Sequence, residues 1–554
     1  MIETLDLVIL IGAMALVAVI SMLASWRERT RDDYFLAGRD LKWWLIGFSL
    51  IASNISTEHF VGMTGNAAQN GLGVASYEWL AAVALVFVAW WLLPHFLRAG
   101  TYTVPEFLEY RYDRLTRSML AALMVVFFVL TVLATVLYSG ALFLSSVLAL
   151  PELLEQSWGV ASESAENVAF LIGVWSIGVG AGIYTVTGGL RAVVWSDLIQ
   201  GAGLLLGGLA VLLLALREIG DGEGMIAGWQ AFTAAHADQL RVVMPADDPD
   251  LPWPALLTGM WIPVMFYWGL NQFITQRTLA SGSLAEGQKG IMLAALIKLA
   301  LPFLVVIPGM MAVPLLGDSL DPAAMDKAYP LLVRELLPVG LFGLMLAAIT
   351  GSIMSTFNSG LNSAATVFTL DLWQTHVQPD LSERGAVRVG RLTTTALVIA
   401  ACLWAPVIHS FEGVFQYIQV FWGFVSAPTC AIFFVGLRWR RVPASAAHFA
   451  LIAGPLMYLI SQGPQWIWTE AEGAAAGGIA GALYAYSSIS FLYHLFVIFA
   501  VLVVILVTWG HLHPLPQPVT TPDRAVVDPQ PWRHARGAGV AILVGTALLY
   551  ALFW

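Results

Sequence analysis

The sequence predicts an all-α membrane protein of about 14 transmembrane helices. Of the 554 residues, 58% are hydrophobic and only 11% are charged, whereas a soluble protein carries about 25% charged residues. Apolar runs of about 20 residues, the length that crosses a bilayer as a helix, recur along the chain. They lie near 5–25, 43–65, 74–98, 117–149, 166–187, 190–216, 254–276, 290–316, 341–375, 392–408, 413–437, 442–462, 486–510 and 537–554.

The basic residues are distributed unevenly over the loops between these runs. Alternate loops hold most of the 26 Lys and Arg residues, for example the groups within 27–31, 111–117, 277–289 and 438–441. The opposite loops hold only Arg217, Arg241, Lys327 and Arg334. Because cytoplasmic loops carry the excess of Lys and Arg, we expect a multi-pass protein of the cell membrane, inner or plasma, with both termini outside.

The ends of the chain and the cysteines suggest simple structural roles. The first apolar run is followed by a basic cluster, whereas a signal peptide is preceded by one, so we expect an anchor helix. The proline-rich stretch 513–518 predicts a flexible linker before the last helix. Cys402 and Cys430 fall inside apolar runs and are expected to be small packing residues rather than a disulfide.

The sequence lacks the short motifs of common enzymes. It contains no phosphate-binding glycine loop, zinc-type cysteine spacing or nucleophile elbow. We therefore expect neither enzymatic activity nor a nucleic-acid partner, and no obligate protein partner is evident. The composition does require a lipid bilayer around the apolar runs.

The second apolar run carries polar residues where a span is usually apolar. Its centre holds Ser53, Asn54, Ser56, Thr57, Glu58 and His59. A carboxylate and an imidazole near the bilayer midplane are costly unless they face a cavity or a partner. We therefore predict a broken helix that lines a solute pathway.

Further spans carry polar residues suited to the same cavity. The third holds Tyr77-Glu78-Trp79, and the seventh holds the stretch 266–272 after Pro263, which indicates a second helix break. Lys298 lies about nine residues into its span, or roughly 13 Å of helical rise. Its side chain either snorkels to the inner surface or faces the same cavity as Glu78 or Gln419.

The ninth span carries a stripe of hydroxyl groups. Their spacing places them on one helical face, and they are Ser352, Ser355, Thr356, Ser359 and Ser363. Such a stripe can serve close helix packing, with the hydroxyls bonded back to their own helix. The functional interpretation is a set of oxygen ligands for sodium, completed by carbonyls that the broken second span leaves free.

The eleventh span begins with an aromatic and amide motif, Phe415-Gln416-Tyr417-Ile418-Gln419. Gln419 lies one turn after Phe415, so an amide and an aromatic ring share a side of the helix. Together with carboxylate and ammonium groups they suit a sugar, which has apolar C–H faces and hydroxyl edges. The alternative is ordinary buried aromatic packing with satisfied polar groups.

These motifs together resemble the solute:sodium symporter family, and within it the sodium/sugar cotransporters, along nearly the whole chain. The matching stretches are 33–39, 52–62, 75–79, 188–197, 271–277, 362–363, 415–419 and 549–554. The resemblance implies one transporter domain, 1–554, with the five-plus-five inverted repeat of the leucine-transporter architecture. The repeats are expected at 43–217 and 254–440, with an anchor helix and loop at 1–42 and peripheral helices at 441–554.

The resemblance also implies roles for individual residues. Sugar contacts fall on Asn54, His59, Glu78, Lys298 and Gln419, where the family also has polar residues in place of Ala81 and Val264. An inner gate falls on Tyr267 and Trp268, and an outer gate on Met63, Tyr77 and Phe415. A sodium site falls on the carbonyls of Ala52, Ile55 and Ser352 and the hydroxyls of Ser355 and Thr356.

A second sodium ion, which some family members bind, is expected at Asp197, Asn358 and Ser359. The alternative for Asp197 is an ion pair with Arg191, or a helix cap after Gly188-Gly189.

The function expected from these features is sodium-driven uptake of a sugar, a hexose such as galactose or glucose, by alternating access. An inositol or another polar solute is the alternative substrate. A sensor that binds solute and sodium without transport is the alternative class of function.

Overall fold

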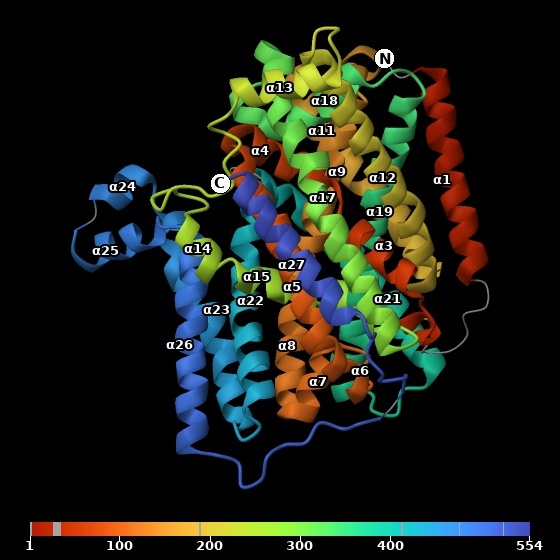
Figure 1. Cartoon of the computed structure of the whole chain (residues 1–554). Helices are drawn as coiled ribbons and strands as arrows, with labels where there is room; N and C mark the ends of the chain where they lie inside the picture. Colours follow the sequence, from red (N-terminus) through yellow and green to blue (C-terminus); the bar gives the residue numbers. More distant parts are fainter. Residues whose placement is uncertain (1–2, 26–34, 188–189, 412–413, 476, 525) are drawn as a thin grey trace.

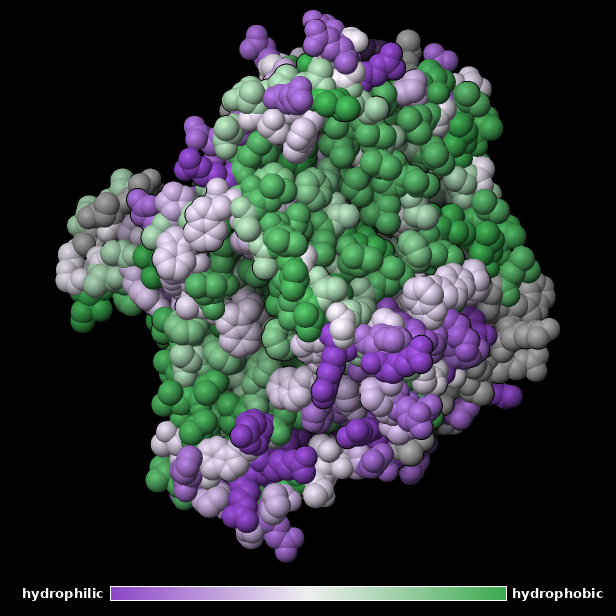
Figure 2. All heavy atoms as spheres, viewed as in Figure 1, coloured by the Kyte–Doolittle hydropathy of each residue, from purple (hydrophilic) through white to green (hydrophobic). Residues whose placement is uncertain are grey.

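The computed structural model describes residues 3–25, 35–187, 190–411, 414–475, 477–524 and 526–554. Helices make up the regular structure of these residues, with β-structure limited to isolated bridges such as Leu41 to Ser281. The long helices run roughly side by side (Figure 1). Figure 2 shows a broad apolar belt with hydrophilic residues gathered at the two ends of the molecule, as expected of a protein that spans a membrane.

Among the described residues, 11 helical segments are long and apolar enough to cross a membrane. They correspond to all but three of the expected spans. The exceptions are the first span, whose helix is described only in part, and the second and seventh, which are interrupted. The count of about 14 therefore stays a prediction, whereas the all-helical class is confirmed.

Helices form most of the first half of the chain. They are α1 Thr4–Ser25, α3 Trp43–Asn54, α4 Thr64–Asn70, α5 Ser76–Phe87, α6 Leu93–Ala99, α7 Val104–Arg111, α8 Arg114–Phe127, α9 Ala134–Val147, α10 Leu150–Trp158, α11 Ser162–Thr187, α12 Leu190–Ile219 and α13 Met225–Ala235. Wider turns of the π type, Val88–Leu92 and Phe128–Leu133, join α5 to α6 and α8 to α9 within continuous helices.

The second half of the chain is also mainly helical. Its helices are α14 Trp253–Thr258, α15 Trp261–Met265, α16 Gln272–Leu279, α17 Leu284–Leu316, α18 Ala328–Leu336, α19 Leu341–Val367, α20 Gln374–His376, α21 Glu383–Trp404, α22 Val414–Arg438, α23 Ala444–Ile467, α24 Glu470–Ala475, α25 Gly478–Ser487, α26 Phe491–Leu512 and α27 Ala535–Leu552. A π-type turn, Phe368–Trp373, joins α19 to α20.

Two helices are broken where the sequence predicts it. Helix α3 ends at Asn54, Ile55 is extended with φ −75° and ψ 105°, and a π-type turn Glu58–Met63 leads into α4. In the second break a π-type turn Phe266–Leu270 follows α15. Asn271 is then extended with φ −86° and ψ 121°, and its side chain caps α16. Each break leaves backbone groups without helical partners, which is tolerated at membrane depth only inside protein or beside a cavity.

The broken helix α3 lies in the centre of the bundle. It packs against α17 on one side and α12 on another, and α12 packs in turn against α19. Helix α17 also contacts α5, which carries Glu78. These contacts bring the break in α3 close to Lys298 of α17 and to the hydroxyl stripe of α19.

Helices from both ends of the chain lie around this bundle (Figure 1). Helix α1 packs on α19 and α12, and the Asp6 carboxylate accepts backbone hydrogen bonds from Gly340 (2.7 Å) and Gly343 (2.9 Å) at the start of α19. Helices α22, α23 and α26 pack together, and α27 crosses α5 and α17.

The proline-rich segment before α27 is held against the protein, contrary to the expectation of a free linker. The backbone N–H of Leu515 donates to the Arg441 carbonyl over 2.9 Å, and that of Val519 donates to the Arg440 carbonyl over 3.0 Å. Farther on, the N–H of Arg524 donates to the Arg98 carbonyl over 2.9 Å. Prolines leave few donors, so the remaining N–H groups fix the path of the segment.

The cysteines behave as expected from their apolar surroundings. Cys402 and Cys430 are both free and buried. Each thiol lies near a backbone carbonyl of another helix, Cys402 near that of Val174 and Cys430 near that of Ile262. They are packing residues and form no disulfide with each other.

Candidate functional site

A cavity of about 80 Å³ lies between the two helix breaks. It is lined by Asn54, Glu58, His59, Met63, Tyr77, Glu78, Ala81, Val264, Tyr267, Trp268, Lys298, Ile418 and Trp422. These residues come from the two broken segments, which are α3 with the turn Glu58–Met63 and α15 with the turn Phe266–Leu270. The others come from α5, α17 and α22. The cavity is small beside the roughly 300–1,000 Å³ of typical ligand pockets, and a buried ion pair crosses it.

That ion pair joins Lys298 of α17 to Glu78 of α5. The Lys298 ammonium donates to the Glu78 carboxylate and to the side-chain oxygen of Asn54, and the lysine is completely buried. The other carboxylate oxygen of Glu78 lies 3.3 Å from Nε2 of His59. The expectation that Lys298 faces the same cavity as Glu78 is therefore confirmed, and the snorkelling alternative is wrong.

Aromatic rings form one wall of the cavity. The Tyr267 ring stacks on the Trp422 ring with centroids 4.7 Å apart and an angle of 19° between the planes. Trp268 lies edge-on to Tyr267, and its ring lies 5.1 Å from the Lys298 ammonium, within cation–π range. The Tyr267 hydroxyl accepts a hydrogen bond from the Asn54 amide over 3.0 Å. The wall is therefore tied to the polar network through Asn54.

The network can bind a polyhydroxylated ring because it offers both donors and acceptors beside flat apolar faces. The Asn54 amide, the Glu78 carboxylate and the Lys298 ammonium now satisfy one another. Buried polar groups of this kind are stabilised only while they are hydrogen-bonded. A ligand with several hydroxyls can take over these bonds one for one, whereas an apolar ligand cannot.

Two of the expected site residues have side chains outside the part of the chain that the structure describes. The side chains of Phe415 and Gln419 are not among those that the structure describes, so their roles remain predictions. Neighbours on the same helix, Ile418 and Trp422, do line the cavity.

The expected sodium site brings the end of α3 against α19. The Ser352 hydroxyl donates to the Ile55 carbonyl over 2.7 Å, and the Thr356 hydroxyl donates to the Ser53 carbonyl over 3.4 Å. The Ser355 hydroxyl donates to the Asp197 carboxylate. Ser352 and Thr356 of the α19 stripe thus face carbonyls beside the helix break, and the ordinary packing alternative, with hydroxyls bonded back to their own helix, does not explain these interhelical bonds.

Asp197 of α12 lies at the centre of a fully buried polar cluster. Its carboxylate accepts hydrogen bonds from Ser49 and Ser53 of α3 and from Ser355 of α19. A guanidinium nitrogen of Arg277 lies 3.2 Å from the same carboxylate. Four chain segments, α3, α12, α16 and α19, therefore meet at one charge.

Two interpretations of the sequence need correction here. Arg191 lies 3.7 Å from Asp40 and not against Asp197, so the expected alternative of an Arg191 pair is wrong. Residues 188–189, the site of the alternative helix cap, lie outside the described residues. Arg277, counted among the basic loop residues, is instead buried on α16 because Asp197 supplies its counter-charge.

The residues expected for a second sodium ion do not all meet. The same Arg277 nitrogen that faces Asp197 donates to the Ser359 hydroxyl over 2.6 Å. The side-chain oxygen of Asn358 accepts from Thr185 of α11 instead. Asp197 and Ser359 are thus linked through a guanidinium, while Asn358 is bonded to another helix.

Sequence reasoning did not name Trp422 or Glu58 among the site residues. Trp422 lies seven residues after Phe415 and three after Gln419, so the helical period could have placed it on the same face. The sequence placed Glu58 in the helix that lines the pathway, as a carboxylate that needs a cavity or a partner, and the Thr135 hydroxyl of α9 is its hydrogen-bond donor. No sequence signal pairs Glu58 with Thr135, which lies 77 positions further along the chain.

A bundle with two broken helices that meet at a polar, aromatic-walled cavity has the design of a secondary transporter. The comparisons with known proteins agree. Residues 34–454 match the model of the sodium:solute symporter family, and this chain belongs to that family.

Two curated relatives cover most of the chain. The sodium/glucose cotransporter of Vibrio parahaemolyticus is 38% identical over 444 residues, 77% of this chain and 78% of the relative. The human sodium/myo-inositol cotransporter 2 is 33% identical over 462 residues, 78% of this chain and 66% of the relative.

A solved structure shows the same fold. The structure of a sodium-coupled sialic acid symporter in a substrate-bound, outward-open state superposes with a TM-score of 0.74 at 21% identity. The match covers 93% of this chain and 99% of that chain. The fold is therefore that of the sodium-coupled symporters with the leucine-transporter architecture.

Proposed function

We propose that this chain is a symporter that couples inward sodium movement to the uptake of a sugar by alternating access. The observation that supports this most directly is the cavity network of Asn54, His59, Glu78 and Lys298 beside the Tyr267 and Trp268 rings. Similarity to a sodium/glucose cotransporter supports a hexose as the substrate. The family consists of transporters, and an enzymatic reaction is not part of the proposal.

The proposed sugar contacts are Asn54, His59, Glu78, Lys298 and Gln419. Sugar hydroxyls would replace the bonds that Lys298 now makes to Asn54 and Glu78. The stacked pair of Tyr267 and Trp422 would cover the apolar face of the ring. Where the family has polar residues, Ala81 and Val264 line the cavity. Fewer hydrogen bonds on that side favour a substrate with an apolar or unsubstituted edge there.

The proposed gates enclose the cavity on its two sides. Met63 and Tyr77 line the cavity, and with Phe415 they form the proposed outer gate. Tyr267 and Trp268 form the inner gate, and the hydrogen bond from Asn54 to Tyr267 ties that gate to the sugar site. A sugar that takes over the Asn54 amide would loosen Tyr267, which offers a route from binding to inner opening.

The proposed sodium site consists of the carbonyls of Ala52, Ile55 and Ser352 and the hydroxyls of Ser355 and Thr356. A sodium ion there would replace the direct bonds from Ser352 to Ile55 and from Thr356 to Ser53. It would then hold the α3 break at a fixed distance from α19. Because α3 carries Asn54, sodium would favour the sugar-competent arrangement by binding it more tightly than the alternatives.

The proposal for a second sodium ion at Asp197, Asn358 and Ser359 depends on Arg277. The guanidinium now supplies the positive charge between Asp197 and Ser359. A second ion would have to displace it, and in the state described here the contacts favour one ion. One ion gains about 2.3 kcal/mol at 100 mV and about 1.4 kcal/mol from a tenfold gradient. Together these sustain roughly a 500-fold sugar gradient.

A cyclic polyol is the second candidate substrate. The chain is 33% identical to a sodium/myo-inositol cotransporter over most of its length. An inositol ring offers hydroxyls all around and no ring oxygen, so the same donors and acceptors could hold it. The side of the cavity at Ala81 and Val264 offers no side-chain hydrogen bonds, which favours the hexose.

Uptake into proteoliposomes tests the proposal. The purified chain is reconstituted, an inward sodium gradient is imposed, and labelled galactose, glucose and myo-inositol are followed separately. We expect concentrative uptake of a hexose with sodium and none with potassium. Binding of the same solutes to the purified chain is measured in parallel. Sodium-dependent binding without concentrative uptake would assign the chain to the sensor class instead.

A further inference from the structure

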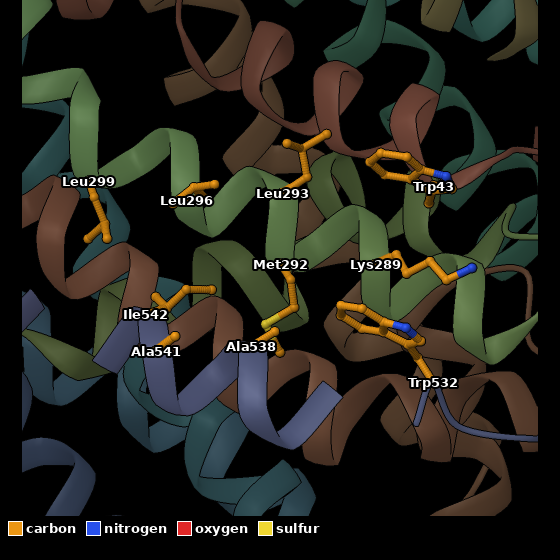
Figure 3. Close-up of a pocket in the computed structure, with 10 residues that line it drawn as sticks. All are labelled: Trp43, Lys289, Met292, Leu293, Leu296, Leu299, Trp532, Ala538, Ala541 and Ile542. Atoms are coloured by element: carbon orange, nitrogen blue, oxygen red, sulfur yellow. The ribbon is translucent and has the colours of Figure 1, made fainter. Parts of the chain in front are cut away.

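A second cavity lies on the outer surface of the bundle, away from the sugar site. It is a groove of about 470 Å³ between α3, α17 and α27. Its floor and walls are apolar, formed by Met292, Leu293, Leu296 and Leu299 of α17 with Ala538, Ala541 and Ile542 of α27. Trp43, Lys289 and Trp532 close one end (Figure 3).

The groove exists because α27 leans on α5 and presents small side chains to α17. At Gly539 the backbone of α27 approaches so close to the Trp90 ring that a Cβ there would lie 2.2 Å from a ring atom. The Trp90 indole N–H also donates to the Ala535 carbonyl over 3.0 Å. On the other face, Ala538 and Ala541 are too short to fill the space beside α17. The packing of α27 on α5 and Trp90 therefore keeps the groove beside α17 open.

The apolar part of the groove faces the membrane. Helices α17 and α27 both lie in segments long and apolar enough to cross a bilayer. Leu296 in the groove is 58% exposed, and Ala541 is exposed as well. In a bilayer an exposed hollow of this kind is filled by acyl chains, since water has no polar partners there.

The closed end of the groove gathers nitrogen donors. Figure 3 shows the indole nitrogens of Trp43 and Trp532 and the ammonium of Lys289 at the same end of the groove. Lys289 donates to Glu286 over 2.9 Å, and the other oxygen of Glu286 accepts the backbone N–H of Trp43 over 2.9 Å. The backbone N–H of Trp532 donates to the Gln288 side chain over 2.8 Å. The first turns of α17 thus hold the backbone of both tryptophans and the Lys289 ammonium at this end.

The charge around this end is net positive, with four basic and three acidic residues among those that the structure describes. Lys42, Arg533 and Arg536 are exposed next to the groove residues in sequence, and Lys289 is partly exposed. The acidic neighbours are Asp528, held beside the start of α17, and Asp40 and Glu286, which pair with Lys42 and Lys289. Figure 2 shows the apolar belt giving way to hydrophilic residues near the start of α27. Tryptophan with lysine at such a boundary is typical of residues that meet lipid headgroups.

We propose that this groove binds one anionic phospholipid. One acyl chain lies along Leu296 and Ala541, and the phosphate accepts hydrogen bonds from Lys289 and the indole groups of Trp43 and Trp532. Basic pockets between membrane helices attract anionic headgroups in this way. The bound lipid joins α27 to α17, whose Leu299 carbonyl accepts the Trp79 indole N–H over 3.2 Å next to Lys298.

Lipid binding to the purified full-length chain tests this site. The delipidated protein is titrated with phosphatidylglycerol or phosphatidylcholine of the same acyl chains, and bound lipids are counted by native mass spectrometry. We expect one tightly retained phosphatidylglycerol and at least about fivefold weaker binding of phosphatidylcholine, the preference expected from one basic group near the phosphate. Equal affinity for the two lipids would overturn the proposal.

Two pairs of variants separate the headgroup from the acyl chain. Lys289→Gln should reduce the preference for phosphatidylglycerol about fivefold, whereas Lys327→Gln, far away on an outer segment, should not. Ala541→Phe should fill the groove and reduce binding of both lipids at least about tenfold. Ala547→Phe, on the same helix and exposed but outside the groove, should leave binding unchanged.

Other occupants give other results. Retention of the lipid in Ala541→Phe would place the bound lipid elsewhere on the surface and overturn the proposal. A dimer mass that disappears in Ala541→Phe but not in Ala547→Phe would assign the groove to a second copy of the chain. Because sugar uptake is not measured, these outcomes are independent of the proposed transport function.

Discussion

Arg277 and Asp197 form a fully buried ion pair, with a guanidinium nitrogen 3.2 Å from a carboxylate oxygen. Arg277 lies on α16, directly after the second helix break, and Asp197 lies on α12, which packs against the broken helix α3. Arg277 also donates to Ser49 of α3 over 2.8 Å and to Ser359 of α19 over 2.6 Å. One side chain therefore connects the elements that must move if the two breaks rearrange during transport.

The Arg277 pair leads to a prediction about stoichiometry. Because the guanidinium supplies the charge between Asp197 and Ser359, we expect one sodium per sugar in the wild-type chain. Reversal potentials in proteoliposomes measure this ratio. A ratio of two that falls to one in Asp197→Asn would mean that sodium displaces Arg277, and would support the second site.

The same ion pair should matter for folding. Removing one partner of a buried pair leaves an uncompensated charge and costs about 3–5 kcal/mol. Arg277→Gln and Asp197→Asn should therefore each lower the unfolding temperature of the purified protein. The double variant Arg277→Gln/Asp197→Asn has no unpaired charge and should recover much of the loss. Additive losses in the double variant would contradict direct pairing.

Breaking the Lys298–Glu78 pair should separate sugar binding from stability. Glu78→Gln leaves the Lys298 ammonium buried beside neutral amides and should both destabilise the protein and abolish uptake. Lys298→Met combined with Glu78→Gln should restore the unfolding temperature, since neither charge remains, but not uptake. Calorimetry measures the unfolding temperature of each variant, and a binding assay in the presence of sodium measures its sugar affinity. Wild-type sugar affinity in the double variant would place the substrate elsewhere.

The hydroxyl stripe of α19 offers a matched pair for testing the sodium site. Ser355→Ala removes a proposed ligand and should raise the sodium concentration for half-maximal uptake by about tenfold, as for a lost bond of about 1.4 kcal/mol. Ser363→Ala is the control, because its hydroxyl donates to Gln276 over 2.8 Å and is no proposed ligand. Equal sodium activation in the two variants would remove the site from Ser355.

Asp326, in the segment between α17 and α18, should make stability depend on pH. Burial raises the pKa of the Asp326 carboxyl to about 6, although the Val414 N–H at the start of α22 donates to it and opposes the rise. The folded state thus binds the proton more tightly than the unfolded state does. Stability should increase as the pH falls through about 6, and the charge should destabilise the protein above that pH.

Asp326→Asn removes this charge and tests the sign. It should raise the unfolding temperature at pH 7.5 and change it much less near pH 4.5, where the native carboxyl is protonated and only the unfolded one still ionises. Measuring the unfolding temperature of both proteins from pH 4.5 to pH 8 gives the difference curve. A variant less stable than the wild type at pH 7.5 would show that the bond to Val414 outweighs the burial cost.

The sequence alone determined the class of protein and the position of its two breaks. Long apolar runs have few solutions in a bilayer, because every backbone group must find a partner within a helix. Polar residues at 53–59 and 266–272 then mark where the helices are interrupted, and Ile55 and Asn271 are extended there. That the α19 hydroxyls share one helical face followed from the helical period, which is local information.

Partner choice between distant helices was decided only by the tertiary structure. Sequence reasoning offered Arg191, six residues away, as an alternative partner of Asp197, whereas the fold brings Arg277 to it from 80 positions along the chain. It treated 513–518 as a free linker, but carbonyls of Arg440 and Arg441 hold that segment. It also missed the groove between α17 and α27. A buried charge takes whichever counter-charge the packing delivers, and a hollow depends on helices meeting at a distance that no local pattern encodes.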